Sequence, residues 1–197
     1  MGGDGTVCET AAGLVHTNTS LGIAPAGTGN DFIKTIGTPR NWKEALDFIL
    51  THPARPVNTG EVNDRFFLNV CGGGFDVLTL TYALEAKKHV KGIWPYLYGV
   101  LRAIRTFKPF KMHIQVGDDL TLDKDCMICT IANGRYIGGG IPIASMADVE
   151  DGLLDVLVVD AVPRWKIPFY LPSLMGGSLY KRKVAHHYRV KTCSLSS

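Results

Sequence analysis

Two glycine-rich polar loops near the N-terminus constrain the fold of this chain more than any other feature. The first is Gly2-Gly3-Asp4-Gly5-Thr6, and the second is Pro25-Ala26-Gly27-Thr28-Gly29-Asn30-Asp31-Phe32. A helical pattern over residues 7–16 and a short apolar run over residues 21–24 separate the two loops. Glycine loops lose much conformational entropy on folding and are fixed only by the elements that they join. The succession of loop, helix, strand and loop therefore predicts an α/β layer.

The two loops have a composition that suits phosphate binding. Loops that follow successive parallel strands lie side by side at the carboxyl edge of a sheet, where ligands bind. The first loop leads into a helix, so its amides and the helix N-terminus could hold phosphate oxygens. Gly27 and Gly29 could add their amides, Thr28 its hydroxyl, and Asp4 and Glu9 could orient a metal ion or a ribose hydroxyl. A tight turn without a ligand is the alternative for either loop taken alone.

The sequence pattern changes after Pro53 from helical spacing to short β-type runs. Short β-type runs separated by Asn-Asp, Gly-Asp-Asp and Asn-Gly turns predict strands over residues 57–61, 65–71, 111–116, 120–123, 127–132, 153–159 and 188–192. Before this point, residues 30–36 and 42–50 predict helices, the first capped by Asn30 or Asp31. Residues 78–107 predict inserted helices joined near Gly92 and Pro95. We expect a domain boundary near residue 55, with an α/β domain over 1–55 and a mostly β domain over 56–197.

Charge is distributed unevenly along the sequence. The formal net charge is +3, but residues 161–197 contain seven basic residues and no acidic one. Aromatic side chains are interleaved with these charges, which suits an anionic membrane surface. Nucleic acid is the competing partner, which we do not expect, and a solvated face is the plain alternative. Five cysteines, an odd number, predict reduced thiols and a cytoplasmic protein. With the basic, aromatic segment, we expect this protein to associate transiently with membranes.

The pairing of Gly-Gly-Asp-Gly-Thr with Pro-Ala-Gly-Thr-Gly-Asn-Asp-Phe resembles the diacylglycerol kinase catalytic family, in particular its bacterial soluble lipid kinases. The likeness continues through residues 57–69, through the Gly-Gly-Gly-Phe-Asp run that ends at Asp76, and at residues 133–134 and 138–140. The resemblance implies a Rossmann-like ATP-binding α/β domain, incomplete here, followed by a mostly β, sandwich-like second domain with inserted helices. It implies transfer of the γ-phosphate of ATP to a hydroxyl of diacylglycerol or a similar membrane lipid.

The resemblance also implies particular nucleotide contacts. These fall on Gly3, Asp4, Gly5, Thr6, Val7, Cys8 and Glu9 in the first loop and helix, and on Thr28 in the second loop, beside Gly27. NAD kinases and phosphofructokinases share the first motif, so an NAD kinase-like enzyme with a soluble substrate is an alternative. The second motif favours the lipid kinases.

An acidic loop at residues 148–153 is a candidate metal site. Asp148, Glu150 and Asp151 supply hard oxygen ligands of the kind that Mg²⁺ takes, although an Asp-Gly turn into a strand is also common scaffolding. By the resemblance, Asp148, Asp151 and the carbonyl of Leu153 would hold a structural Mg²⁺.

The catalytic base is not evident in the sequence. In the family that this chain resembles, the base belongs to an Asp-Gly-Glu motif near the C-terminus, and no such motif occurs here. We therefore expect a fragment shortened at both ends, with the base beyond Ser197 and Asp4 as a substitute. A non-catalytic remnant that binds nucleotide or lipid is the other option, and the oligomeric state is open, with a homodimer as one option.

Overall fold

The computed structural model describes residues 1–90, 94–117 and 120–196. Its chain divides into two compact units, the first made of residues 1–71 and 132–155 and the second of residues 72–131 and 156–197. After residues 72–131 of the second unit, the chain returns to the first unit for residues 132–155 and then enters the second unit again. Among the described residues, no helix is both long and apolar enough to cross a bilayer.

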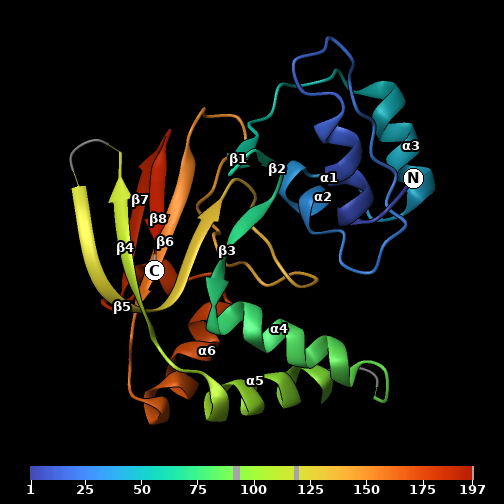
Figure 1. Cartoon of the computed structure of the whole chain (residues 1–197). Coiled ribbons are helices and arrows are strands. Elements are labelled where there is room, and N and C mark those ends of the chain that lie inside the picture. Colours follow the sequence, from blue (N-terminus) through green and yellow to red (C-terminus); the bar gives the residue numbers. More distant parts are fainter. Residues whose placement is uncertain (91–93, 118–119, 197) are drawn as a thin grey trace. The chain divides into compact units, whose positions relative to one another are not determined.

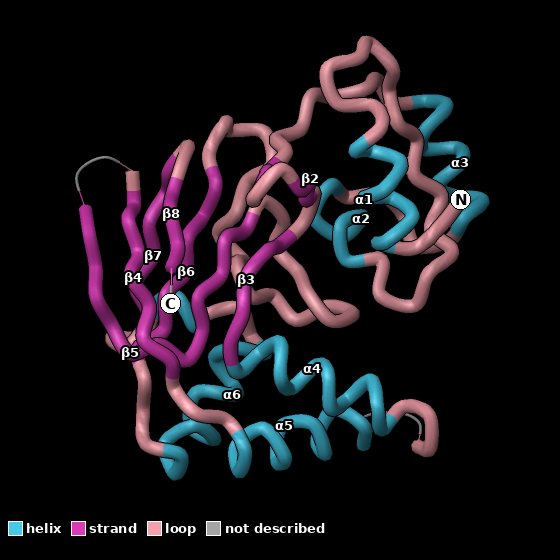
Figure 2. Tube along the Cα trace, viewed as in Figure 1, coloured by secondary structure: helices cyan, strands magenta, loops and turns pink. Residues whose placement is uncertain are grey.

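The first unit holds three short helices and a hairpin. The helices are α1 (Asp4–Ala12), α2 (Asp31–Ile36) and α3 (Trp42–Thr51), and the hairpin strands are β1 (Gly60–Val62) and β2 (Arg65–Phe67). The hairpin turns through Asn63 and Asp64, whose φ angles of 48° and 60° suit a two-residue turn. Figure 2 shows that loops, drawn in pink, connect most of these elements.

A small apolar core holds the first unit together. It joins α1 and α2 to three buried residues that lie outside these helices. Its buried members are Val7, Ile23, Phe32, Ile33, Leu68 and Val149. Val149 belongs to the acidic loop, and Val7 and Phe32 lie within the first turns of the two helices that follow the glycine loops. Burial of these side chains therefore fixes both loops and the acidic loop by the hydrophobic effect.

The second unit is built on a six-stranded sheet with the strand order β7-β6-β5-β4-β8, in which β3 pairs with β5. The strands are β3 (Val70–Gly74), β4 (Phe110–Val116), β5 (Leu120–Ala132), β6 (Leu154–Asp160), β7 (Ala185–Val190) and β8 (Cys193–Ser196). Strand β4 pairs antiparallel with both β5 and β8. Glycines in β3 permit its close approach to β5, because a Cβ on Gly72 or Gly74 would overlap backbone atoms of that strand.

The helices of the second unit gather at one end of this sheet, as Figure 1 shows. They are α4 (Phe75–Ala86), α5 (Trp94–Thr106) and α6 (Ile167–Met175), with 3₁₀ turns η1 (Arg164–Lys166) and η2 (Leu179–Lys181) beside α6. The expected α/β class and β-rich second part with inserted helices are confirmed.

Three local predictions from the sequence need correction. Residues 21–24 form no strand; next to them, Gly2 makes one isolated parallel bridge to Pro25. The runs 120–123 and 127–132 form one strand, since β4 continues its pairing across the residues between them. The run 188–192 covers the end of β7 and the two residues that connect it to β8. The predicted helix junction at Gly92 lies outside the described residues.

Candidate functional site

The two glycine loops meet in the first unit. The amide of Gly2 donates to the carbonyl of Ala24 at 3.2 Å, and the amide of Ala26 donates to the carbonyl of Gly2 at 2.9 Å. Gly3 and Gly27 face each other so closely that a Cβ on Gly3 would lie 3.0 Å from the Cα of Gly27. Only glycine at both positions leaves room for this backbone contact. The structure therefore brings together the two loops that the sequence singled out.

Asp4 ties the first loop to the start of α2. Its Oδ1 accepts hydrogen bonds from the amide of Asp31 at 2.6 Å and from the amide of Phe32 at 3.2 Å. Asn30 stands at the N-cap position but has a left-handed φ of 48° and makes no side-chain cap, because its side chain bonds back to Gly27. Asn30 is thus the N-cap residue, as predicted, but the capping hydrogen bonds come from Asp4 of the other loop.

A third glycine loop, Gly138-Gly139-Gly140, joins the first two. Asp31 is 5% exposed, and its Oδ2 accepts a hydrogen bond from the amide of Gly139 at 2.8 Å. Its Oδ1 forms an ion pair with Lys34 at 2.6 Å. A Cβ on Gly29 would lie 2.8 Å from Asp4 Oδ2 and 3.8 Å from the Cα of Gly139. Asp4 and Asp31 together therefore hold three backbone loops in one place.

This arrangement leaves the N-terminus of α1 without a side-chain cap. Gly3 is the N-cap residue and makes no side-chain hydrogen bond. The first amides of a helix have no partner within the helix and favour anions. Gly5 and Thr6 are exposed here, as is Thr28 in the second loop.

The remaining predicted nucleotide contacts lie on α1 in different surroundings. Val7 is buried in the core and Cys8 is partly buried against it, so neither side chain faces solvent freely. Glu9 is exposed one turn further along the helix. A ligand at the helix N-terminus would therefore meet backbone amides first, with Glu9 at its margin.

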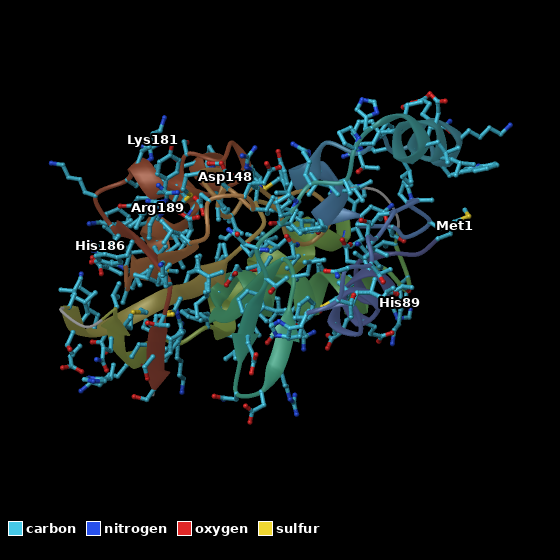
Figure 3. All side chains as sticks on the ribbon, turned by 90° about the horizontal axis from the view of Figure 1, so that it is seen from above. Met1, His89, Asp148, Lys181, His186 and Arg189 are labelled. Carbon is cyan, nitrogen blue, oxygen red and sulfur yellow. The ribbon has the colours of Figure 1, made fainter. Side chains whose placement is uncertain are left out.

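The acidic loop presents three oxygens to one point. Asn58 Nδ2 lies 3.4 Å from the main-chain carbonyl of Asp148, 3.3 Å from Asp151 Oδ1 and 3.4 Å from the carbonyl of Leu153. Asp148, labelled in Figure 3, turns its carboxylate towards the amide of Glu150 at 3.0 Å. The three predicted metal ligands thus converge, and Asp148 takes part through its carbonyl.

Asn58 is the residue that the sequence reasoning missed. Its Oδ1 accepts a hydrogen bond from the amide of Gly152 at 3.1 Å, and its own carbonyl accepts one from Asn133 Nδ2 at 2.8 Å. Asn133 is buried and also donates to the carbonyl of Leu68 at 2.7 Å. In the sequence, Asn58 and Asn133 stand out as asparagines in otherwise apolar or turn segments. They are 75 residues apart, and no spacing rule links the two positions.

The donor set of this loop fits a hard cation. Two carbonyl oxygens and one carboxylate oxygen are ligands that Mg²⁺ accepts, and the partial positive charge of the Asn58 amide group now faces all three. Among the described residues, no group of three or more His, Cys, Asp or Glu side chains is placed to hold a metal ion.

Two family models match this chain, one after the other. Residues 1–62 match the diacylglycerol kinase catalytic domain, and residues 69–197 match the YegS C-terminal NAD kinase beta sandwich-like domain. The first two glycine loops lie within the first match, and the third glycine loop, the acidic loop and the six-stranded sheet lie within the second.

Individual relatives agree with these matches. A protein named as a YegS-like lipid kinase in Pseudomonas putida KT2440 is 35% identical over 89% of this chain, which covers 59% of that relative. The diacylglycerol kinase of Bacillus subtilis 168 is 30% identical over 80% of this chain and 53% of its own length. The crystal structure of a diacylglycerol kinase from Bacillus anthracis Sterne matches with a TM-score of 0.76 and 28% identity, over 98% of this chain and 63% of that one. The chain thus spans between about half and two thirds of the length of these relatives.

Proposed function

The chain belongs to the family of diacylglycerol kinases and YegS-like lipid kinases, and on that premise we propose that it binds ATP for phosphoryl transfer to a lipid alcohol. The acceptor class is diacylglycerol or a membrane lipid with a similar free hydroxyl. The observation that carries the proposal is the meeting of three glycine loops at the uncapped N-terminus of α1.

The α1 terminus and the second loop would bind the phosphates of ATP. The first-turn amides offer donors that need no side chain, and the adjoining helix dipole favours negative charge. Gly27 and Thr28 extend this surface from the second loop. Phosphoryl transfer depends mainly on positioning and charge neutralisation, and a rigid backbone cradle supplies the first.

Asp4 has two candidate roles in this proposal. Its hydrogen bonds to Asp31 and Phe32 support a positioning role, in which it holds the second loop beside α1. A role as the catalytic base would use the remaining oxygen, Oδ2, near Gly29. We favour the positioning role, because Oδ1 is already engaged by two backbone amides at the start of α2.

The acidic loop would hold Mg²⁺ through the carbonyls of Asp148 and Leu153 and the carboxylate of Asp151. The ion would supply positive charge that orders the loop. Asn58 holds the same oxygens together by its amide group, so its side chain would turn away when the cation binds. Val149, packed in the core, anchors the loop during this exchange.

A phosphotransferase assay tests the proposal. Radiolabelled ATP is offered with diacylglycerol in mixed micelles and, separately, with NAD, using this chain and a version extended by the sequence that flanks it in its source DNA. We expect label in phosphatidic acid with at least the extended version. Label in NAD alone would establish the soluble-substrate alternative, and label in neither acceptor would overturn the kinase assignment.

A further inference from the structure

Helix α5 is apolar on two opposite faces. Pro95, Gly99, Val100 and Ala103 are buried against the rest of the second unit. On the other face, Trp94, Leu97, Tyr98 and Leu101 are 65%, 44%, 46% and 49% exposed. These four residues follow the i, i+3, i+4, i+7 spacing of one helix face. An exposed apolar stripe of this kind marks an interaction surface.

Basic side chains continue the stripe. Arg102, Arg105 and Lys108 are exposed at the C-terminal end of α5 and just after it. Arg102 forms a 3.0 Å ion pair with Glu85 and lies 4.2 Å from the centre of the Tyr82 ring. The order along the helix is thus aromatic and aliphatic first, then cationic. Helices that lie in a membrane interface have the same mixture of Trp, Tyr, Leu and cations.

The start of α6 adjoins the cationic end of α5. Arg164 Nη2 donates to the carbonyl of Phe107 at 3.2 Å, which places η1 directly beside the end of α5, as Figure 1 also shows. Here Trp165 is 68% exposed and Phe169 is 71% exposed. Lys166 stands beside the Trp165 ring, 5.2 Å from its centre. We call the exposed residues Trp94, Leu97, Tyr98, Leu101, Arg102, Arg105, Lys108, Trp165, Lys166 and Phe169 the α5–α6 surface.

The charged side chains of the α5–α6 surface are all basic, and one of them, Arg102, is paired with Glu85 of α4. Residues 94–116 and 161–197 contain no acidic residue at all, and the hydrogen bond between Arg164 and Phe107 joins these two segments in space. Lys and Arg side chains near an anionic bilayer strengthen membrane binding. A second copy of the same chain would instead bring like charges together.

We infer that the α5–α6 surface docks on an anionic lipid bilayer, with the aromatic and leucine side chains entering the headgroup region. This inference rests on the proposed function, since a kinase for a lipid alcohol must reach its acceptor at a membrane. It assigns the contact to two short, acid-free segments of the second unit.

Vesicle flotation of the full chain without ATP tests the inference, so its outcome does not depend on catalysis. We expect the chain to float with vesicles of phosphatidylglycerol and phosphatidylcholine at low salt and to remain behind with phosphatidylcholine alone. The double variant Leu97→Glu/Leu101→Glu should weaken this partition by about tenfold or more. Leu50→Glu is the matched control, because Leu50 is a 76% exposed leucine on α3, and it should bind as the unchanged chain does.

Tryptophan quenching locates the contact. Brominated phosphatidylglycerol should quench Trp42→Phe, which keeps Trp94 and Trp165, but not Trp94→Phe/Trp165→Phe, which keeps Trp42. Equal flotation with neutral vesicles, equal loss in Leu50→Glu, or quenching of Trp42 alone would overturn the inference. So would a dimer in sedimentation velocity that the Leu97→Glu/Leu101→Glu variant abolishes, because a second copy would then be the occupant.

Discussion

Asp4 joins two parts of the chain that the sequence places 27 residues apart. Its Oδ1 caps α2, while its own residue opens α1, so one carboxylate aligns the starts of two helices. In the proposed function, a side chain in this position would set the shape of the backbone that holds the phosphates. At the scale of single residues, the glycine loops therefore depend on an acid as much as on their glycines.

Asparagine and alanine at position 4 should separate positioning from stability. Asp4→Ala removes the cap of α2 and should lower the free energy of unfolding by about 0.5–2 kcal/mol. Asp4→Asn keeps an oxygen acceptor for both amides and should lose less than half as much. Urea unfolding followed by circular dichroism measures both values. Equal losses in the two variants would contradict the capping role, and loss of activity in Asp4→Asn with normal ATP binding would instead favour Asp4 as base.

Asp76 is a buried acid at the start of α4. It is 6% exposed, and its Oδ1 has no hydrogen-bond partner among the described residues. Burial raises the pKa of Asp76 above its usual 3.8, so the folded chain binds this proton more tightly than the unfolded chain does. The resulting stability is fully present below pH 3.8 and is lost as the pH rises through the folded pKa.

Asp76→Asn should flatten this part of the pH dependence. The amide carries no titratable proton, so the free energy of unfolding of the variant should fall less from about pH 4 towards neutrality than that of the unchanged chain. Urea titrations at a series of pH values measure the slopes. Asp47→Asn, at an exposed position on α3, serves as the control. Parallel slopes for Asp76→Asn and the unchanged chain would refute the assignment.

The acidic loop between β5 and β6 acts as an element of its own. Asp151 Oδ1 accepts a hydrogen bond from the amide of Leu153 at 2.8 Å and faces the same amide group of Asn58 as the two carbonyls do. A loop preformed in this way loses little entropy when a cation replaces the amide group.

Mg²⁺ should stabilise the chain through this loop. At about a hundredfold excess over Kd, binding adds about 2.7 kcal/mol to the free energy of unfolding. Asp151→Asn keeps the acceptor for Leu153 but removes the charge, and it should lose most of the Mg²⁺-dependent rise in Tm. Glu150→Gln is the control, since Glu150 pairs with Arg55 at 2.9 Å outside the converging oxygens. A rise in Tm that survives in Asp151→Asn, or that Glu150→Gln abolishes, would argue against the site.

Local sequence patterns predicted the features that depend mainly on residues close together in the sequence. The glycine loops and α3 followed from residue types and apolar spacing, and the contact between Gly3 and Gly27 followed from the α/β alternation. The prediction of a strand at residues 21–24 was wrong, because a strand needs partners along its length and the described residues supply one isolated bridge, from Gly2 to Pro25. Asn58 and Asn133 could not be foreseen, since their roles depend on a contact between segments 75 residues apart.

At the scale of the whole molecule, the chain interleaves two units. Residues 132–155 return to the first unit after β5, and they carry both the third glycine loop and the acidic loop. The apolar periodicity of the sequence does not indicate this return, because the return depends on where Val149 and Asn133 are buried in the folded chain. The boundary near residue 55 and the nucleotide contacts on α1 stay predictions.

ATP binding to the glycine loops tests the central claim most directly. Isothermal titration calorimetry of ATP with Mg²⁺ should give saturable binding to the unchanged chain. Gly27→Ala places a Cβ in steric overlap with the Cα of Gly3, so the two loops must move apart, and the variant should bind ATP about tenfold or more weakly. Gly13→Ala, where a Cβ would meet only an ordinary contact at 3.6 Å, should bind as the unchanged chain does. Absence of binding to the unchanged chain, or equal affinity in Gly27→Ala, would contradict the account.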